Sequence, residues 1–301
     1  MLHCLSHQWK HKAGGGSRVM GISGQRATLI FSDLDGCLID HDGYGYAASA
    51  QTLAELRTRV PIILNSSKTF AEVEQWQQEL ALDTPFIFEN GSAIAFPLHW
   101  SPSLPASAYP YRNRLVISLA GPRELLLHRL SALANDYRFQ GFYNMSVEEV
   151  VSHTGLDTES ARRAKERLFT EPLLWQDGEE QLLDFSQALD ADGLCVQRGG
   201  RFVHVMDRVD KAMAMRTLQI MLEQRDNTCY QTLALGDSGN DRRMLESADI
   251  ACVVRKPSGE HLKLKRSQGV HYSTEIGSCG WNQLVRELMA QGLINGERNH
   301  G

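Results

Sequence analysis

The 301-residue sequence lacks any apolar run of the roughly 18–20 residues that a membrane-spanning helix requires. Its first 27 residues are polar and contain no apolar core segment, so we expect no secretory signal there. We therefore expect a protein with no membrane partner. Residues 1–27 are expected to form a flexible leader and residues 293–301 a short tail.

Cysteine and positive charge are both sparse. The six cysteines form no CxxC pair and no zinc-binding spacing, which favours reduced thiols and a cytoplasmic location. The 31 Lys and Arg residues are outnumbered by 36 Asp and Glu residues, for a net charge of −5. This balance argues against a nucleic-acid partner. Composition excludes these classes but names no reaction.

Short apolar segments alternate with segments of helical periodicity near both ends of the chain. The expected strands are 28–34, 61–65, 86–88, 231–236 and 250–254, and the expected helices are 48–60, 69–82, 211–224 and 241–247. This alternation is typical of an α/β fold, a Rossmann-like doubly wound parallel sheet.

The pattern changes at residue 97. Residues 99–114 hold three of the nine prolines and resemble a linker, and mixed strands and helices follow as far as residue 198. The chain is also too long for one comfortable hydrophobic core. We expect a discontinuous core, 28–96 and 199–292, interrupted by an inserted α+β domain at 97–198.

Acidic residues follow two of the expected strands. Asp33 and Asp35 end the first strand, and Asp237 and Asp241 lie in the sequence GDSGND after a later one. A single DxD pair is more often a solvated acidic turn. Two such clusters at strand ends favour a ligand-binding site, because open α/β sheets bind ligands at the carboxyl ends of their strands.

Two further polar groups lie at the ends of expected elements. Ser66, Ser67 and Lys68 follow strand 61–65, and Lys211 opens a helix. Alone, each has an ordinary explanation as a turn, a helix cap or a solvated lysine. Together, these groups suit phosphoryl transfer through an aspartate: one carboxylate attacks phosphorus, a second acts as acid and base, and Mg²⁺, Ser and Lys offset the phosphate charge.

The segments DLDG (33–36), SSK (66–68), Lys211 and GDSGND (236–241) resemble the four ordered motifs of the haloacid dehalogenase superfamily of phosphatases. The resemblance spans residues 28–256. It implies that Asp33 is the nucleophile, that Asp35 is the general acid and base, and that the inserted domain is a cap.

The same resemblance assigns the remaining polar groups. It implies Mg²⁺ as the cofactor, with Asp33, Asp35 (through its backbone carbonyl), Asp237 and Asp241 at the metal. It also implies that Ser66 binds phosphate and that Lys211 steadies the phosphate and the nucleophile. Ser67, Lys68 and Asn240 are further candidates for binding phosphate or substrate, Lys68 because its charge directly follows the motif serines. Cys37 replaces the threonine that usually follows DxDG, a change that leaves both carboxylates in place.

Within this superfamily, the segments ILNSSKT, PFIFENGSAI and GGRFVHVMD are similar to those of mannosyl-3-phosphoglycerate phosphatases. The similarity implies a phosphorylated sugar acid as the substrate and mannosylglycerate as the product. The alternatives are a phosphatase for another sugar phosphate, such as a sucrose phosphate, a phosphomutase, and a binder of phosphorylated ligands without catalysis.

Arg201 and His204 are expected to lie where the chain returns from the inserted domain. Both are expected to face the same side of a strand at 201–206, where a guanidinium would pair with a substrate carboxylate. They are equally well explained as the polar face of a half-buried strand. We also expect the cap to close about two linkers, near 97–112 and 198–201.

Overall fold

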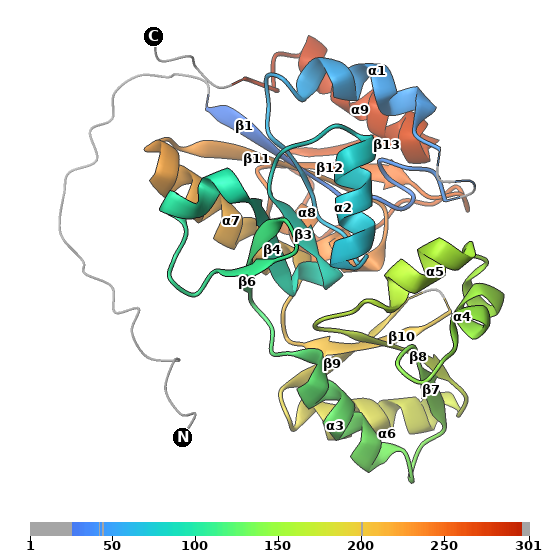
Figure 1. The fold of residues 1–301 in the computed structure, drawn as a ribbon. Helices are drawn as coiled ribbons and strands as arrows, with labels where there is room; N and C mark the ends of the chain where they lie inside the picture. The colour runs from blue at the N-terminus through green and yellow to red at the C-terminus, as the bar shows by residue number, and fades with distance from the viewer. Residues whose placement is uncertain (1–25, 42, 44, 200, 297–301) are drawn as a thin grey trace.

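The computed structural model describes residues 26–41, 43, 45–199 and 201–296. Its larger part is built on a five-stranded sheet in the order β13-β12-β11-β1-β2 (Figure 1). All neighbouring pairs in this sheet are parallel, as predicted. The strands are β1 (Ala27–Ser32), β2 (Ile62–Leu64), β11 (Tyr230–Gly236), β12 (Ile250–Arg255) and β13 (Val270–Ile276).

Helices cover both faces of the sheet, because successive strand residues point to opposite sides. Ile30 packs with α1 (Ala47–Leu56), α2 (Phe70–Glu79) and α9 (Gly277–Ala290). Leu29 and Phe31 pack on the other face with α7 (Lys211–Asp226) and α8 (Arg242–Ser247). The sheet is therefore doubly wound, and the carboxyl ends of its strands are directed towards the second domain (Figure 1).

A second, antiparallel sheet extends the core beyond β2, in the order β3-β4-β6-β5. Its strands are β3 (Phe86–Phe88), β4 (Ala93–Pro97), β5 (Tyr109–Tyr111) and β6 (Arg114–Ser118). The backbone N–H of Ser66 donates to the carbonyl of Ile87 at 3.1 Å, which joins the two sheets. The predicted boundary at residue 97 therefore falls inside the core. The prolines of residues 99–114 do not mark a linker, because Pro110 lies in the edge strand β5, where a missing N–H is tolerated.

The inserted domain has its own four-stranded antiparallel sheet, in the order β7-β8-β10-β9. The strands are β7 (Phe139–Gly141), β8 (Glu171–Trp175), β9 (Leu194–Arg198) and β10 (Val203–Asp207); the helices are α3 (Arg123–Leu133), α4 (Val147–Thr154), α5 (Thr158–Lys165) and α6 (Glu179–Asp190). Helices α3 and α6 pack on its outer face (Figure 1). Because β10 pairs with β8 and β9, the chain leaves this domain after residue 207. We propose 123–207 as the extent of the cap.

The described structure extends into both segments that were expected to form the leader and the tail. Ala27 is already the first residue of β1, and residues 1–25 lie outside the described part. Near the other end, Ile294 is buried and the carbonyl of Asn295 accepts from the N–H of Thr28 at 3.0 Å. Residues 297–301 of the expected tail lie outside the described part.

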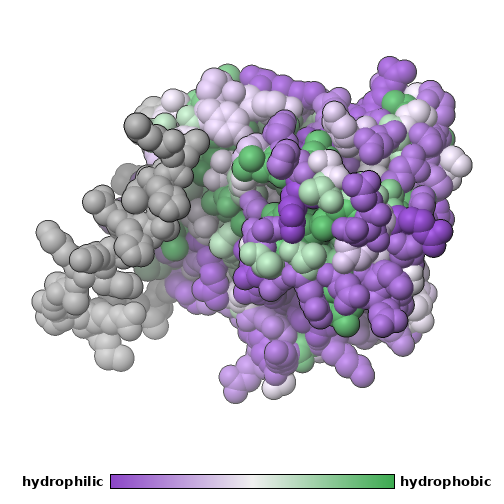
Figure 2. Space-filling view, turned by 90° about the horizontal axis from the view of Figure 1, so that it is seen from below, coloured by the Kyte–Doolittle hydropathy of each residue, from purple (hydrophilic) through white to green (hydrophobic). Residues whose placement is uncertain are grey.

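The surface seen from the cap side is mainly hydrophilic, with hydrophobic residues in small groups (Figure 2). Within the described ranges, every helix falls short of the length and apolarity that crossing a membrane would take.

Candidate active site

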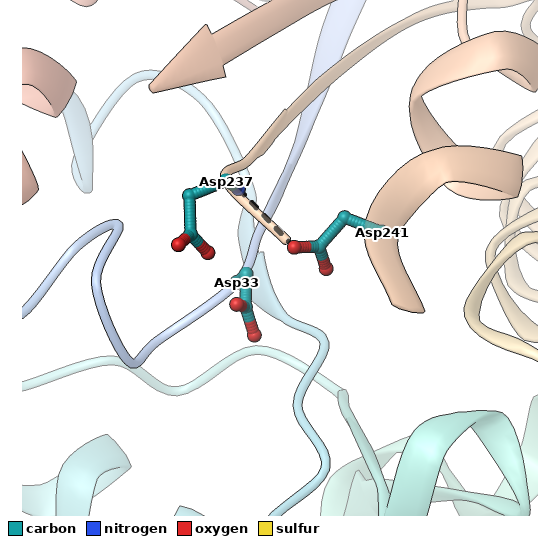
Figure 3. Close-up of side chains that lie close together, drawn as sticks. All are labelled: Asp33, Asp237 and Asp241. Atoms are coloured by element: carbon teal, nitrogen blue, oxygen red, sulfur yellow. Dashed lines mark hydrogen bonds between the residues drawn. The ribbon is translucent and has the colours of Figure 1, made fainter. Parts of the chain in front are cut away.

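Three aspartates meet where β1 and β11 end (Figure 3). Asp33 follows β1, Asp237 follows β11, and Asp241 closes the 3₁₀ turn Gly239–Asp241. One carboxylate oxygen of each lies within 4.8 Å of the others. All three side chains are buried. Such carboxylates repel one another strongly unless a cation lies among them.

Lys211 supplies one cation from the first position of α7. Its Nζ donates to Asp33 Oδ1 at 2.6 Å and to Asp241 Oδ1 at 2.7 Å, and the residue is 1% exposed. Burial alone would lower the pKa of Lys211, but the negative charges of Asp241 and Asp33 raise it by more. The pKa of Lys211 therefore lies above its ordinary value. Lys211 is therefore a permanent cation in this site.

The 3₁₀ turn Glu89–Gly91 supports the start of α7. A Cβ on Gly91, which has a φ of 92°, would lie 2.2 Å from the carbonyl oxygen of Asp210. Only glycine permits this close approach. Asp210 in turn caps α7, because its Oδ1 accepts from the N–H of Met213 at 2.8 Å. These contacts fix the position from which Lys211 reaches Asp33.

Asp241 is fully engaged by the protein. Its Oδ1 binds Lys211, and its Oδ2 accepts from the backbone N–H groups of Asp237 at 3.2 Å and Ser238 at 3.0 Å (Figure 3). Asp237 Oδ1, in contrast, is buried without a hydrogen-bond partner among the described residues. Burial, reinforced by the charge of Asp241, raises the pKa of Asp33 and of Asp237. A divalent cation bound by Asp33 and Asp237 fits this donor set, with Asp241 as their support.

Asp35 lies apart from this cluster. The loop turns at Gly36, which has a φ of 72°, and the Asp35 carboxylate meets Lys68 instead, with Oδ1 3.0 Å from Nζ. Lys68 Nζ also lies 3.7 Å from Glu72 Oε1. The two carboxylates of the DxD segment therefore have different environments: Asp33 is buried, and the Asp35 side chain is 29% exposed. Different environments suit different roles.

A cavity of about 380 Å³ separates the core from the cap. Its core wall includes Asp33, Asp35 and Ser67, and its cap wall includes Gln197 and His204. Ser66 lies behind Ser67, buried, and its Oγ accepts from the N–H of Lys68 at 3.2 Å. The structure thus brings the predicted residues of three separate segments to one cavity.

Asn240 also lines this cavity, and its Nδ2 donates to Asn90 Oδ1 at 3.1 Å. His204 lies opposite Gln197 in the β9–β10 pair. Burial, with a contribution from the charge of Arg167, lowers the pKa of His204 to about 3. His204 is therefore a neutral hydrogen-bonding group at neutral pH.

The expectation that Arg201 and His204 face the same side is wrong. Arg201 precedes β10, is exposed, and donates from Nη1 to the carbonyl of His153. Residues three apart along a strand also point to opposite faces. Arg201 is not among the described residues that line the cavity, whereas His204 is.

Sequence reasoning missed His41, which lines the cavity. His41 has its Nε2 3.7 Å from Asp237 Oδ2, and a hydrogen bond to Asp237 raises the pKa of His41. Asn90 and Arg198 also line the cavity. The only sequence signal for His41 is the short polar segment 40–43, which follows the apolar residues 37–39 after DLDG.

The fold and the site together define a capped α/β enzyme with an acidic centre at the carboxyl ends of its parallel strands. Residues 30–102 match the family model of the haloacid dehalogenase-like hydrolases. The chain is 35% identical over 267 residues to the glucosyl-3-phosphoglycerate/mannosyl-3-phosphoglycerate phosphatase of Methanococcoides burtonii, a match that covers 87% of this chain and 97% of that protein. It is 30% identical over 263 residues to the enzyme of the same name from Persephonella marina, with the same coverage.

Solved structures share the fold. The sucrose-phosphatase of Synechocystis sp. PCC6803 has a TM-score of 0.55 at 17% identity, over 88% of this chain and 98% of that one. A phosphatase of the haloalkanoate superfamily from Bacteroides thetaiotaomicron has a TM-score of 0.60 at 16% identity, over 93% and 100%.

The chain belongs to the haloacid dehalogenase-like hydrolases. It is a phosphoric monoester hydrolase that resembles the glucosyl-3-phosphoglycerate/mannosyl-3-phosphoglycerate phosphatases.

Proposed function

We propose that this enzyme hydrolyses mannosyl-3-phosphoglycerate to mannosylglycerate and phosphate. The observation that carries the phosphatase chemistry is the buried Asp33, held by Lys211 at the end of β1 and open to the interdomain cavity. The names of the two curated relatives support a sugar ester of 3-phosphoglycerate as the substrate, with the glucosyl ester as its nearest competitor.

In the proposed first step, a carboxylate oxygen of Asp33 attacks the phosphorus atom and the bond from phosphorus to the glycerate oxygen breaks. Lys211 binds Oδ1 of Asp33, so Oδ2 is the attacking oxygen. Asp35 donates its proton to the departing glycerate oxygen. The products of this step are an aspartyl-phosphate on Asp33 and the free sugar acid.

In the second step, Asp35 accepts a proton from a water molecule that attacks the same phosphorus atom. The bond from phosphorus to Asp33 then breaks, which releases inorganic phosphate and restores both carboxyl groups. The side-chain contact of Asp35 with Lys68, at 3.0 Å, keeps its carboxylate beside the cavity. A phosphomutase would instead return the phosphoryl group to a second sugar hydroxyl.

The residues proposed to hold Mg²⁺ are Asp33, Asp237 and the backbone carbonyl of Asp35. Bound there, Mg²⁺ offsets the repulsion between an anionic nucleophile and an anionic phosphate. Asp241 is assigned to positioning, because both of its oxygens are already bound by Lys211 and by backbone N–H groups.

Polar residues in the cavity wall and directly beside it are proposed to bind the substrate. Ser66, Ser67, Lys68 and Asn240 suit the phosphate, because hydroxyl, amide and ammonium groups stabilise its oxygens. Gln197 and neutral His204 form the opposite wall and suit the hydroxyl groups of a sugar acid. Reduced thiols and a small-molecule substrate make the cytoplasm the proposed location.

The proposal is tested by phosphate release with Mg²⁺ across mannosyl-3-phosphoglycerate, glucosyl-3-phosphoglycerate and sucrose 6-phosphate. We expect the first substrate to have the highest kcat/KM and Asp33→Asn to abolish release at least about 1,000-fold, as loss of a nucleophile does. Asp83→Asn, at an exposed carboxylate of the core, is the control and retains activity. A preference for sucrose 6-phosphate would show that mannosyl-3-phosphoglycerate is not the substrate. Turnover by Asp33→Asn would show that Asp33 is not the nucleophile.

A further inference from the structure

The loop Ser66–Thr69, which carries the proposed phosphate ligands, is held by two neighbours. One is the turn Glu89–Gly91 of the core, and the other is the cap segment 163–170. The hydrogen bonds are Asn90 N–H to Ser66 O at 3.0 Å, Glu89 N–H to Lys68 O at 2.9 Å, Arg167 Nη1 to Ser67 O at 3.3 Å, and Thr69 Oγ1 to Arg163 O at 2.9 Å. Every residue of the loop therefore bonds to one neighbour or the other.

Glu89 joins these two neighbours to each other. Its buried carboxylate accepts four hydrogen bonds from the cap: from the N–H groups of Leu168 at 2.8 Å, Phe169 at 3.1 Å and Thr170 at 2.8 Å, and from Thr170 Oγ1 at 2.7 Å. Hydrogen bonds to an ionised acceptor are the strong ones. Loss of this acceptor would leave three N–H groups without this partner, two of them buried, those of Phe169 and Thr170.

The backbone of the turn also indicates constraint. Glu89 has a φ of 48° and Asn90 a φ of 58°, a left-handed conformation that is uncommon for residues other than glycine. Such conformations persist where the surroundings over-determine them. The four bonds to the Glu89 carboxylate provide that constraint, and through it they fix Asn90 at the cavity wall and Gly91 against Asp210.

Arg167 is the cap residue that this contact brings to the phosphate loop. Its Nη1 donates to Thr170 Oγ1 at 2.8 Å as well as to Ser67 O, and its Nε is buried without a hydrogen-bond partner among the described residues. Its charge contributes to the lowered pKa of His204. Arg167 thus lies close to both Ser67 and His204, which line opposite walls of the cavity.

We propose that Glu89 is a positioning residue for the reaction: its carboxylate fixes cap segment 168–170 on the core and thereby holds Arg167 beside the substrate cavity. The cap is then connected to the phosphate loop directly, and not only through its two linkers, the segments 119–122 and 208–210. The catalytic part of this inference rests on the proposed function, because it requires a substrate that extends from the phosphate to the cap.

The kinetic test compares Glu89→Gln with Glu74→Gln. A glutamine offers one acceptor oxygen and turns an NH₂ group towards N–H donors, so it loses part of the contact. Glu74 is a buried glutamate of α2 in the same domain, outside the catalytic and binding machinery. We expect Glu89→Gln to lower kcat/KM for mannosyl-3-phosphoglycerate about tenfold or more, and that for acetyl phosphate, too small to reach the cap, less than about threefold.

Hydrogen exchange tests the contact without any substrate. In Glu89→Gln, the amides of Leu168, Phe169 and Thr170 are expected to exchange at least about tenfold faster, and in Glu74→Gln at the wild-type rate. If Glu89→Gln fails to fold, Thr170→Val removes one donor to Glu89 with little change of shape, and the same amides are expected to exchange faster.

Unchanged exchange of these amides would overturn the proposal. So would an equal loss of kcat/KM on both substrates, which would indicate general damage to the site. Failure of the proposed function would show differently, as a wild-type enzyme that hydrolyses acetyl phosphate but not the sugar ester. In that case the exchange result alone would decide the role of Glu89.

Discussion

Lys211 is the residue on which the acidic site depends most. It is enclosed by protein and shares its ammonium between two buried carboxylates, Asp33 and Asp241. A buried ion pair of this kind contributes little net stability while intact. Removal of one partner is costly, because the remaining charges are buried without compensation.

We expect Lys211→Met to lower the free energy of unfolding by about 3–5 kcal/mol, the cost of a broken buried pair, and to abolish phosphate release. Urea unfolding measures the first effect. The control, Lys263→Met on the exposed surface, should change stability by less than about 0.5 kcal/mol. A loss below about 1 kcal/mol for Lys211→Met would show that the carboxylates are neutral in the folded protein.

His204 makes stability depend on pH. Its folded pKa of about 3 lies below the ordinary value of 6.5, so the unfolded chain binds one more proton between these two values. The stabilisation is therefore complete above pH 6.5 and is lost as pH falls towards 3, by at most about 1.4 kcal/mol per pH unit. Urea unfolding at pH 7, 6 and 5 should show a smaller loss for His204→Asn than for the wild type. Equal losses would contradict the burial of a neutral His204.

Among the structural elements, the turn Glu89–Gly91 contacts several separate parts of the site. It connects β3 to β4, touches the phosphate loop and supports α7. We expect Gly91→Ala to destabilise the fold by more than about 2 kcal/mol, because an alanine at a φ of 92° is strained and its Cβ meets the Asp210 carbonyl at 2.2 Å.

Gly155→Ala is the matched control for this change. Gly155 ends α4 with a φ of 79° and has no atom within 4 Å of an added Cβ. Its substitution should cost only the backbone term, about 1 kcal/mol. The difference between the two variants in chemical denaturation isolates the close approach at Gly91. Equal costs would show that the turn and α7 can separate without loss.

The parallel core was predictable because its strands are buried apolar runs. Strands such as 28–34 and 231–236 stand out in the sequence, and topology then brings Asp33, Ser66 and Asp237 to one edge. Strand β13 was missed, because VHYSTEI is an edge strand whose residues are mostly polar or exposed. The role of Glu89 was also beyond sequence reasoning, since its hydrogen-bond donors lie 79–81 residues further along the chain.

At the scale of the whole molecule, the cap and the core share part of one hydrophobic cluster. Phe169 belongs to the cap by sequence but packs in the core cluster, with its ring centroid 5.8 Å from that of Phe88. Phe185, in contrast, packs within the cap's own cluster. Two domains that share a buried side chain in this way should unfold together.

A loss of packing in one domain should therefore also lower the stability of the other. Phe185→Ala removes about 3–5 kcal/mol of packing from the cap. In the otherwise wild-type protein, we expect this loss to lower the protection of core amides in β11 as well, measured by hydrogen exchange.

With Phe169→Ala also present, the same Phe185→Ala change should lower protection in the cap and leave β11 unchanged. Phe169 buries its ring in the core, so its removal leaves the domains connected by the two linkers and by the hydrogen bonds of cap segment 163–170 with Glu89, Ser67 and Thr69. If Phe185→Ala lowers the protection of β11 equally in both backgrounds, the coupling does not pass through Phe169. The coupling would then pass through the hydrogen bonds of cap segment 163–170, which include the four to the carboxylate of Glu89.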